Sequence, residues 1–85
     1  MHLEILTPEK RLFQGEVYGI QLPGITGSFE VLDRHAPLVS ALGRGTLKVL
    51  ADKSGNNASR YEIQGGFIEI IGNKASVLVE GAVEK

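Results

Sequence analysis

The sequence predicts an all-β fold, a sandwich or flattened barrel built from short strands. Apolar and polar residues alternate in six short segments, which is the period of a half-buried strand. Eleven glycines and three prolines separate these segments. No stretch of helical length has apolar positions at helical spacing without a Gly or Pro inside it. Short strands with frequent turn signals are typical of a β-sandwich or barrel.

Each strand is predicted from its own alternation. In the first, Leu3 and Ile5 point one way and Glu4 the other, whereas the second slips out of register near Gly19. The six strands, in chain order, are LEILT (3–7), part of GEVYGIQLP (15–23), TLKVLAD (46–52), RYEIQG (60–65), FIEIIG (67–72) and ASVLVEG (75–81). The stretch between Gly27 and Gly43 alternates less cleanly. Some of its apolar residues must fill the core, and the excess over what one small core can hold suits a partner surface; they are Phe29, Val31, Leu32, Leu38, Val39 and Leu42.

Turn-forming residues predict the connections. TPEK (7–10) is predicted to be a turn with Pro at its second position, LPGITGS (22–28) a loop, KSGNNAS (53–59) a hairpin loop and GNK (72–74) a tighter hairpin turn. The adjacent glycines of QGGF (64–67) indicate a bulge or close backbone packing. The tail EGAVEK (80–85) is expected to fray.

Length and composition limit the function classes. Eighty-five residues form one domain. Nine basic and ten acidic side chains give no electrostatic case for nucleic acid. The absence of cysteine excludes disulfides and thiolate metal sites. There is no signal-peptide core and no apolar run long enough to span a bilayer.

DRHAPLV (33–39) contains the strongest candidate for chemistry, Asp33 two residues before His35. A catalytic histidine needs an orienting group and a nucleophile or pocket, and no nucleophile motif is present. His2 and His35 are too isolated for a metal site, and the glycines of LPGITGS and ALGRGTL do not match a phosphate-binding pattern. We therefore expect no metal and no cofactor, and an enzyme acting through Asp33 and His35 is the least favoured alternative. A free β-sandwich that binds a small ligand or peptide at a sheet edge stays open as an alternative.

Several motifs together point to a known family. The chain contains LEILTPEKRLFQGEV, LPGITGSFEVLDRHAPLV, GTLKV, GGFIEI and ASVLVEG, in this order. Their order and spacing closely resemble the N-terminal β-sandwich of the epsilon subunit of F-type ATP synthases, over nearly the whole chain. The resemblance implies a ten-stranded sandwich of two sheets.

The resemblance also implies a mechanical function. The family's domain is a non-catalytic rotor subunit of the central stalk, and it couples the gamma subunit to the membrane ring of c subunits during ATP synthesis and proton or ion transport. The expected partners are therefore the gamma subunit and the c-ring, with no nucleic acid and no cofactor. The expected location is peripheral, at the cytoplasmic face of the bacterial plasma membrane, with membrane association only through the complex.

Two groups of contact residues follow from the match. The resemblance implies a ring-facing loop made of Pro23, Gly24, Ile25, Thr26, Gly27, Ser28, Phe29 and Glu30. It implies a gamma-facing surface that includes Thr7, His35, Pro37, Leu38 and Ser40. Three positions depart from the family pattern. Glu30 replaces a common glycine, Asp33 replaces a common proline, and Ser28 stands where some relatives have an acid.

Most relatives continue into a C-terminal helical hairpin that inhibits ATP hydrolysis and, in some members, binds nucleotide. The 85 residues contain no counterpart of this hairpin. The expectation from the resemblance is a single domain, residues 1–85, in a short form that does not impose the inhibited state. The role of Asp33 is left unassigned.

Overall fold

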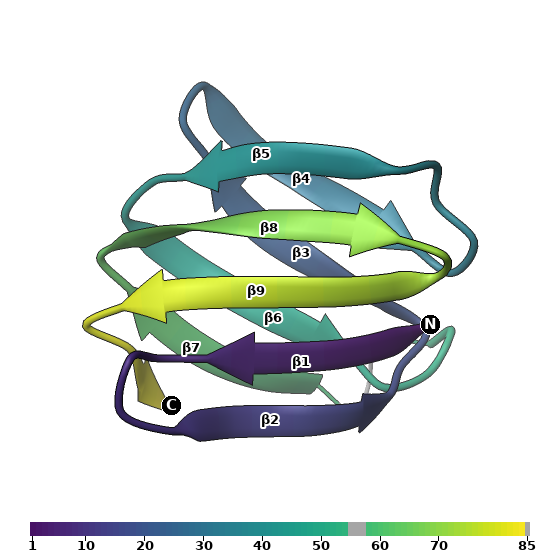
Figure 1. Cartoon of the computed structure of the whole chain (residues 1–85), viewed down its shortest axis with the longest axis horizontal. Helices are drawn as coiled ribbons and strands as arrows, with labels where there is room; N and C mark the ends of the chain where they lie inside the picture. Colours follow the sequence, from purple (N-terminus) through teal and green to yellow (C-terminus); the bar gives the residue numbers. More distant parts are fainter. Residues whose placement is uncertain (55–57, 85) are drawn as a thin grey trace.

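The computed structural model describes residues 1–54 and 58–84, and these residues form ten β-strands (Figure 1). The strands are β1 (His2–Leu6), β2 (Arg11–Glu16), β3 (Gly19–Gly24), β4 (Gly27–Leu32), β5 (Leu38–Leu42), β6 (Gly45–Leu50), β7 (Ala58–Ile63), β8 (Gly65–Ile71), β9 (Lys74–Glu80) and β10 (Val83–Glu84). The predicted all-β class and the predicted number of strands are confirmed.

All ten strands belong to one hydrogen-bonded sheet, which curls until two layers face each other. The order is β10-β7-β6-β3-β5-β8-β9-β1-β2, and β4 pairs with the free side of β3. Figure 1 shows β5, β8, β9, β1 and β2 as a front layer, with the other strands behind it. The layers join where Gly24 of β3 pairs with Leu42 of β5. The predicted sandwich therefore takes the form of a single curled sheet.

The core lies between the two layers and is entirely apolar among the described residues. Alternate positions along β1, β7, β8 and β9 point inward, as the period of two predicted. The largest fully buried side chains are Leu3, Ile5, Ile20, Leu22, Leu47, Ile63, Ile68, Ile70, Val31, Val49, Val77 and Val79. In β1, Leu3 and Ile5 are buried as expected, and Glu4 points to the outer face, where its carboxylate lies near two cations.

The break in the apolar–polar alternation near Gly19 marks the point where the chain leaves the front layer. Val17 still continues the pairing of β2 with β1, since its N–H donates to the Met1 carbonyl at 2.9 Å. Two residues later Gly19 begins β3 in the rear layer, opposite Leu50 and Leu32. The alternation breaks there because the two strands face the core from opposite sides.

Two predicted turns are confirmed. In TPEK, the Thr7 N–H donates to the Lys10 carbonyl at 2.8 Å. In GNK, Gly72 and Asn73 both have positive φ, 58° and 61°, as a two-residue hairpin with the twist of its flanking strands requires. The predicted loop KSGNNAS includes residues 55–57, which lie outside the described residues.

Two other expectations are wrong. LPGITGS is not a loop, because β3 continues through Gly24 and β4 begins at Gly27, which leaves only Ile25 and Thr26 in the turn. The tail does not fray at Val83 and Glu84, which pair with β7 as β10. In the first case a glycine pair serves the close approach of two strands: a Cβ on Gly24 would lie 2.6 Å from the Gly27 carbonyl oxygen.

Candidate interaction surfaces

The side chains of Asp33 and His35 form hydrogen bonds with different partners. Asp33 Oδ1 accepts a hydrogen bond from the Met1 ammonium at 2.5 Å and another from Asn73 Nδ2 at 3.1 Å. The His35 ring instead places Nδ1 2.7 Å from the Ala36 carbonyl. Asp33 therefore does not orient His35 as a general base. Residues 1–54 and 58–84 contain no group of three His, Cys, Asp or Glu side chains placed to hold a metal ion.

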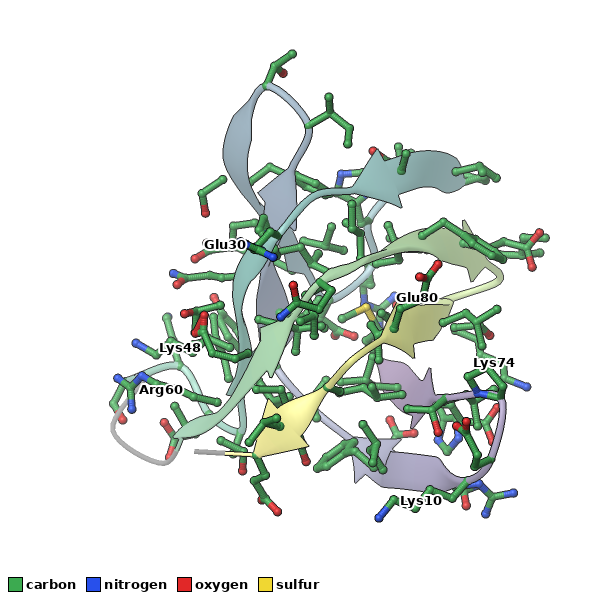
Figure 2. The ribbon with its side chains drawn as sticks, turned by 90° about the vertical axis from the view of Figure 1, so that its left-hand side faces the viewer. Lys10, Glu30, Lys48, Arg60, Lys74 and Glu80 are labelled. Atoms are coloured by element: carbon green, nitrogen blue, oxygen red, sulfur yellow. The ribbon has the colours of Figure 1, made fainter. Side chains whose placement is uncertain are left out.

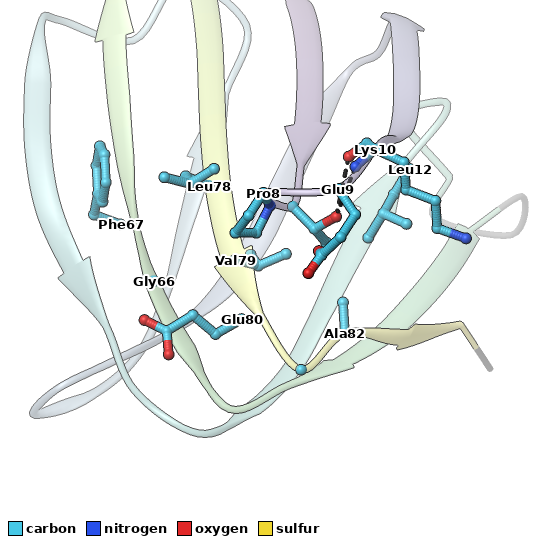
Figure 3. Close-up of a pocket in the computed structure, with 12 residues that line it drawn as sticks. Pro8, Glu9, Lys10, Leu12, Gly66, Phe67, Leu78, Val79, Glu80 and Ala82 are labelled. Atoms are coloured by element: carbon cyan, nitrogen blue, oxygen red, sulfur yellow. Dashed lines mark hydrogen bonds between the residues drawn. The ribbon is translucent and has the colours of Figure 1, made fainter.

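Thr7 shapes a turn at one end of the front layer. Its hydroxyl accepts a hydrogen bond from the Lys10 N–H at 3.1 Å and donates one to the Lys10 carbonyl at 3.2 Å. Beside this turn lies an open cleft of about 710 Å³, bounded on the other side by the end of β9 (Figure 3). Its lining is Thr7, Pro8, Glu9, Lys10, Leu12, Gly66, Phe67, Leu78, Val79, Glu80, Gly81 and Ala82. Most of these residues are apolar or glycine. The cleft is therefore not a deep polar cavity, which is the feature that would have favoured a free ligand-binding domain.

His35 and Pro37 lie at the opposite end of the front layer from Thr7. Both are exposed residues of the connection between β4 and β5. This connection is fixed to the β8–β9 turn, because the Arg34 N–H donates to Asn73 Oδ1 at 2.8 Å. Figure 1 shows the β4–β5 connection and the β1–β2 turn at opposite ends of the sheet.

Leu38 and Ser40 face the interior side of β5. Ser40 pairs with the buried Ile68, and Leu38 packs against the core. The residue between them, Val39, points the other way and is 70% exposed. The sequence-predicted gamma-facing residues are therefore not one cluster. They comprise Thr7 at one end of the layer, His35 and Pro37 at the other, and two side chains that turn inward.

The outer face of the front layer carries an apolar surface that the sequence analysis did not assign. Its exposed apolar residues come from β5, β8 and β9 and lie on neighbouring strands: Val39, Phe67, Ile71 and Leu78. Ala41 lies opposite Phe67, and Phe67 lies opposite Leu78, so these three residues form a continuous apolar row across three strands. The exposed Glu69 lies between Phe67 and Ile71 on β8 and opposite Val39, so one carboxylate interrupts the surface there. We call the five apolar residues the front apolar face.

One sequence signal could have identified this face. In FIEII, the residues facing inward are Ile68 and Ile70, yet two of the three residues in the other register, Phe67 and Ile71, are also apolar, with Glu69 between them. A strand that is largely apolar on both faces indicates burial on both sides. Because no segment within residues 1–54 or 58–84 covers Phe67 and Ile71 on the outer side of β8, a partner is the expected cover.

The outer face of the rear layer is polar by contrast. Gln21 Nε2 donates to Glu30 Oε2 at 2.8 Å, and Thr46 Oγ1 donates to Glu62 Oε2 at 2.7 Å. Lys48 pairs with Arg60 across β6 and β7, and Figure 2 shows the two side chains close together at the surface. The sandwich therefore has two unlike outer faces.

The predicted ring-facing segment, residues 23–30, forms the β3–β4 hairpin, which projects from the top of the molecule in Figure 1. At its turn Ile25, Thr26, Gly27 and Ser28 are exposed, and Ile25 is 68% exposed. We call these four residues the hairpin tip. Below the tip, Phe29 packs against the core, and the exposed Glu30 of β4 accepts a hydrogen bond from Gln21 of β3.

An all-β sandwich with an apolar outer face and a projecting apolar tip belongs to the class of small interaction domains. Residues 1–85 match the family described as "ATP synthase, Delta/Epsilon chain, beta-sandwich domain". The chain is 44% identical over 79 residues to the ATP synthase epsilon chain of Chlorobium limicola, covering 92% of this chain and 86% of that relative. It is 39% identical over 84 residues to the epsilon chain of Caulobacter vibrioides, covering 99% and 94%.

A solved structure agrees with these sequences. The Euglena gracilis mitochondrial ATP synthase, OSCP/F1/c-ring in rotational state 1, contains a chain that superposes with a TM-score of 0.86 at 25% identity, over 96% of this chain and 51% of that one. The chain therefore belongs to the ATP synthase delta/epsilon family, and the predicted resemblance is confirmed. Membership makes it a non-catalytic, central-stalk subunit of an F-type ATP synthase. No helix within residues 1–54 or 58–84 is long and apolar enough to span a membrane.

Proposed function

We propose that the chain couples the gamma subunit to the c-ring, with gamma on the front apolar face and the ring on the hairpin tip. The observation that carries this proposal is the presence of two separate groups of exposed apolar side chains, one around Phe67 on the front layer and one at Ile25 on the hairpin tip. A subunit that transmits rotation needs two partners bound at different places. The epsilon-chain relatives of Chlorobium and Caulobacter support a place at the cytoplasmic face of a bacterial plasma membrane, with membrane association through the complex.

The front apolar face supports the assignment to gamma. Thr7 lies beyond one end of this face and His35 and Pro37 beyond the other, so one flat partner surface that covers the face also reaches all three residues. Leu38 and Ser40 contribute from beneath, because their packing against the core keeps β5 in place. This version of the gamma-facing surface adds Val39, Phe67, Ile71, Leu78 and Ala41 to the predicted residues.

The hairpin supports the assignment to the ring. Its tip offers one large apolar side chain, Ile25, flanked by small polar residues. Below the tip, β3 pairs with β4 over six positions and with β6 over three, and the β3 residues Ile20 and Leu22 are fully buried. A force applied to Ile25 therefore passes into the packed core rather than into a flexible loop.

The test replaces one isoleucine on each surface by glutamate. Ile71 on the front apolar face is 61% exposed and Ile25 on the hairpin tip is 68% exposed, so Ile71→Glu and Ile25→Glu are closely matched. If each side chain is buried by its partner, the change removes about 2–3 kcal/mol of binding free energy, or about 30- to 150-fold in Kd. Val83→Glu, at a residue 62% exposed outside both surfaces, is the control.

The measurements are the affinity of purified chain for the gamma subunit and the retention of the chain on an isolated c-ring with gamma present. Ile71→Glu should weaken gamma binding, and Ile25→Glu should leave it within about twofold of the unmodified chain while reducing contact with the ring. Loss of gamma binding in Ile25→Glu, or wild-type gamma binding in Ile71→Glu, would show that the two surfaces are assigned wrongly.

A further inference from the structure

One carboxylate, that of Glu69, lies within the front apolar face. Glu69 is on the outer side of β8, between Phe67 and Ile71. Its direct cross-strand neighbours are Val39 of β5 and Ser76 of β9. Three of these four neighbours are apolar and exposed, Phe67 by 45%, Ile71 by 61% and Val39 by 70%. The charge of Glu69 is therefore surrounded by the same side chains that are proposed to contact gamma.

The Glu69 carboxylate has no partner within residues 1–54 and 58–84, where no side chain donates a hydrogen bond to it or forms an ion pair with it. Lys74 lies diagonally across from it on β9, opposite Ile71. The Lys74 ammonium, however, is 3.8 Å from Glu4 Oε1, on the strand at the other side of β9. Glu4 also has Arg11 Nε at 3.6 Å. The cations of this layer are therefore engaged by Glu4, and Glu69 is left without one.

A partner that covers the front apolar face must compensate the charge of Glu69. This step rests on the proposed function, in which gamma is that partner. Closing the contacts to Phe67, Val39 and Ile71 also removes water from the carboxylate that they surround. A carboxylate that is taken out of water without a hydrogen-bonded counter-charge is strongly destabilising. The partner surface must therefore present a cation over Glu69.

Phe67 decides which cation fits. Its side chain lies on the surface opposite Leu78 of β9 (Figure 3). Residues two apart on one strand are separated by about 6.5 Å, so a group bound to the Glu69 carboxylate can also reach the Phe67 ring. An arginine guanidinium can donate two N–H bonds to a carboxylate and lay its plane on an aromatic ring, whereas a lysine ammonium is a compact and strongly hydrated charge. We propose that the front apolar face recognises an arginine of the gamma subunit, paired with Glu69 and stacked on Phe67.

Glu80 provides a matched control for the charge. It is a second exposed glutamate on the outer side of β9, and it too has no side-chain hydrogen bond or ion pair among the described residues. It lies opposite Gly65 at the end of its strand, where it borders the open cleft. Water can remain around a carboxylate at such a rim, so its charge should contribute little to binding.

The test measures the Kd of the purified chain for the purified gamma subunit at low and at moderate salt. Glu69→Gln should weaken binding by about 30-fold or more, because it leaves the arginine buried without its counter-charge. The affinity of this variant should also fall less steeply with salt than that of the unmodified chain. Glu80→Gln should change Kd by less than about threefold. Because Glu69 is exposed and has no partner among the described residues, Glu69→Gln should leave the midpoint of urea denaturation unchanged.

Phe67→Leu tests whether the cation is an arginine. The change keeps an apolar side chain but removes the ring, and it should weaken gamma binding by about three- to tenfold. Combined with Glu69→Gln, it should lose less than the product of the two single losses, because both changes act on the same guanidinium. A lysine paired with Glu69 alone would make the two losses multiply.

Three results would overturn the proposal: unchanged or tighter gamma binding in Glu69→Gln, an equal loss in Glu80→Gln, or losses from Glu69→Gln and Phe67→Leu that multiply. Ile71→Glu separates this failure from failure of the proposed function. If Ile71→Glu weakens gamma binding and Glu69→Gln does not, gamma covers the face without an arginine at Glu69. If Ile71→Glu binds gamma as the unmodified chain does, the face itself is assigned wrongly.

Discussion

Gly66 is the position where one added methyl group should have the largest effect on this fold. It lies in β8 between Leu42 of β5 and Val79 of β9. A Cβ built on it would lie 2.1 Å from the Leu78 carbonyl oxygen and 2.9 Å from the Val79 Cα. Both contacts are to backbone, so no side chain can rotate to relieve them, and β9 itself would have to move away. Gly66→Ala therefore tests how tightly the front layer is held.

The expected magnitude has two parts. The φ of Gly66 is 147°, a region almost restricted to glycine, and an alanine there costs about 1–3 kcal/mol. Separating β8 from β9 enough to admit the methyl group sacrifices one or two ladder hydrogen bonds at about 1 kcal/mol each. The sum is about 3–5 kcal/mol. A domain of this length has a total stability of about 4–13 kcal/mol, so the variant should lie close to its unfolding threshold.

Gly72 provides the matched control. It also has a positive φ, 58°, but a Cβ there would have no heavy atom within 4 Å. Gly72→Ala should therefore cost only the left-handed backbone conformation, about 1–2 kcal/mol.

Urea denaturation followed by circular dichroism measures both variants, with the midpoint shift converted through the slope m. If Gly66→Ala and Gly72→Ala lose the same stability within about 0.5 kcal/mol, the clash with β9 has no energetic weight and the reasoning fails. The same result would mean that adjacent glycines in QGGF serve backbone conformation alone, not close packing.

Two further predictions concern the core and the Asp33 site. Ile68 is fully buried and Ile71 is 61% exposed on the same strand. In urea denaturation, Ile68→Ala should therefore lower the free energy of unfolding by about 2–5 kcal/mol, and Ile71→Ala by less than about 0.5 kcal/mol. Equal losses of stability would contradict the inward register of β8. The pKa of Asp33 is lower in the folded chain than its ordinary value of 3.8, chiefly because the Met1 ammonium donates to it, so its contribution to stability is complete above that value and is lost as the pH falls through the lowered one. Asp33→Asn should flatten the acid limb of a stability–pH curve, and an unchanged limb would exclude the ion pair as its source.

Alternation along the chain predicted the strands because one face of each must be buried. Leu3 and Ile5 in β1, and Val77 and Val79 in β9, are buried as the pattern required. Local patterns of this kind predict the structure correctly because they depend only on neighbours in sequence. The two confirmed turns, TPEK and GNK, are local in the same sense.

The features that escaped prediction depend on residues far apart in sequence. Gly24 and Gly27 suggested a loop, yet they allow two strands to approach, and that depends on a backbone partner across the hairpin. Asp33 had no assignable role because its partner is an amino terminus 32 residues earlier, which no side-chain motif can reveal. The front apolar face was missed because only the sheet order places Val39 beside the outer residues of β8.

Between β3 and β5, where the two layers of the sheet join, there are few hydrogen bonds, and this affects how force passes between the hairpin tip and the front apolar face. Between β3 and β5 the register has one partner pair, Gly24 and Leu42, with one more hydrogen bond beside it from the Gly43 N–H to the Pro23 carbonyl at 2.7 Å. The hairpin tip belongs to the rear layer and the front apolar face to the front layer, so few hydrogen bonds carry force directly between them. Stiffness between the two surfaces must therefore come mainly from side chains packed between the layers, such as Leu22 and Ile68. A cavity at Ile68 should accordingly loosen the coupling of the two surfaces even in molecules that remain folded.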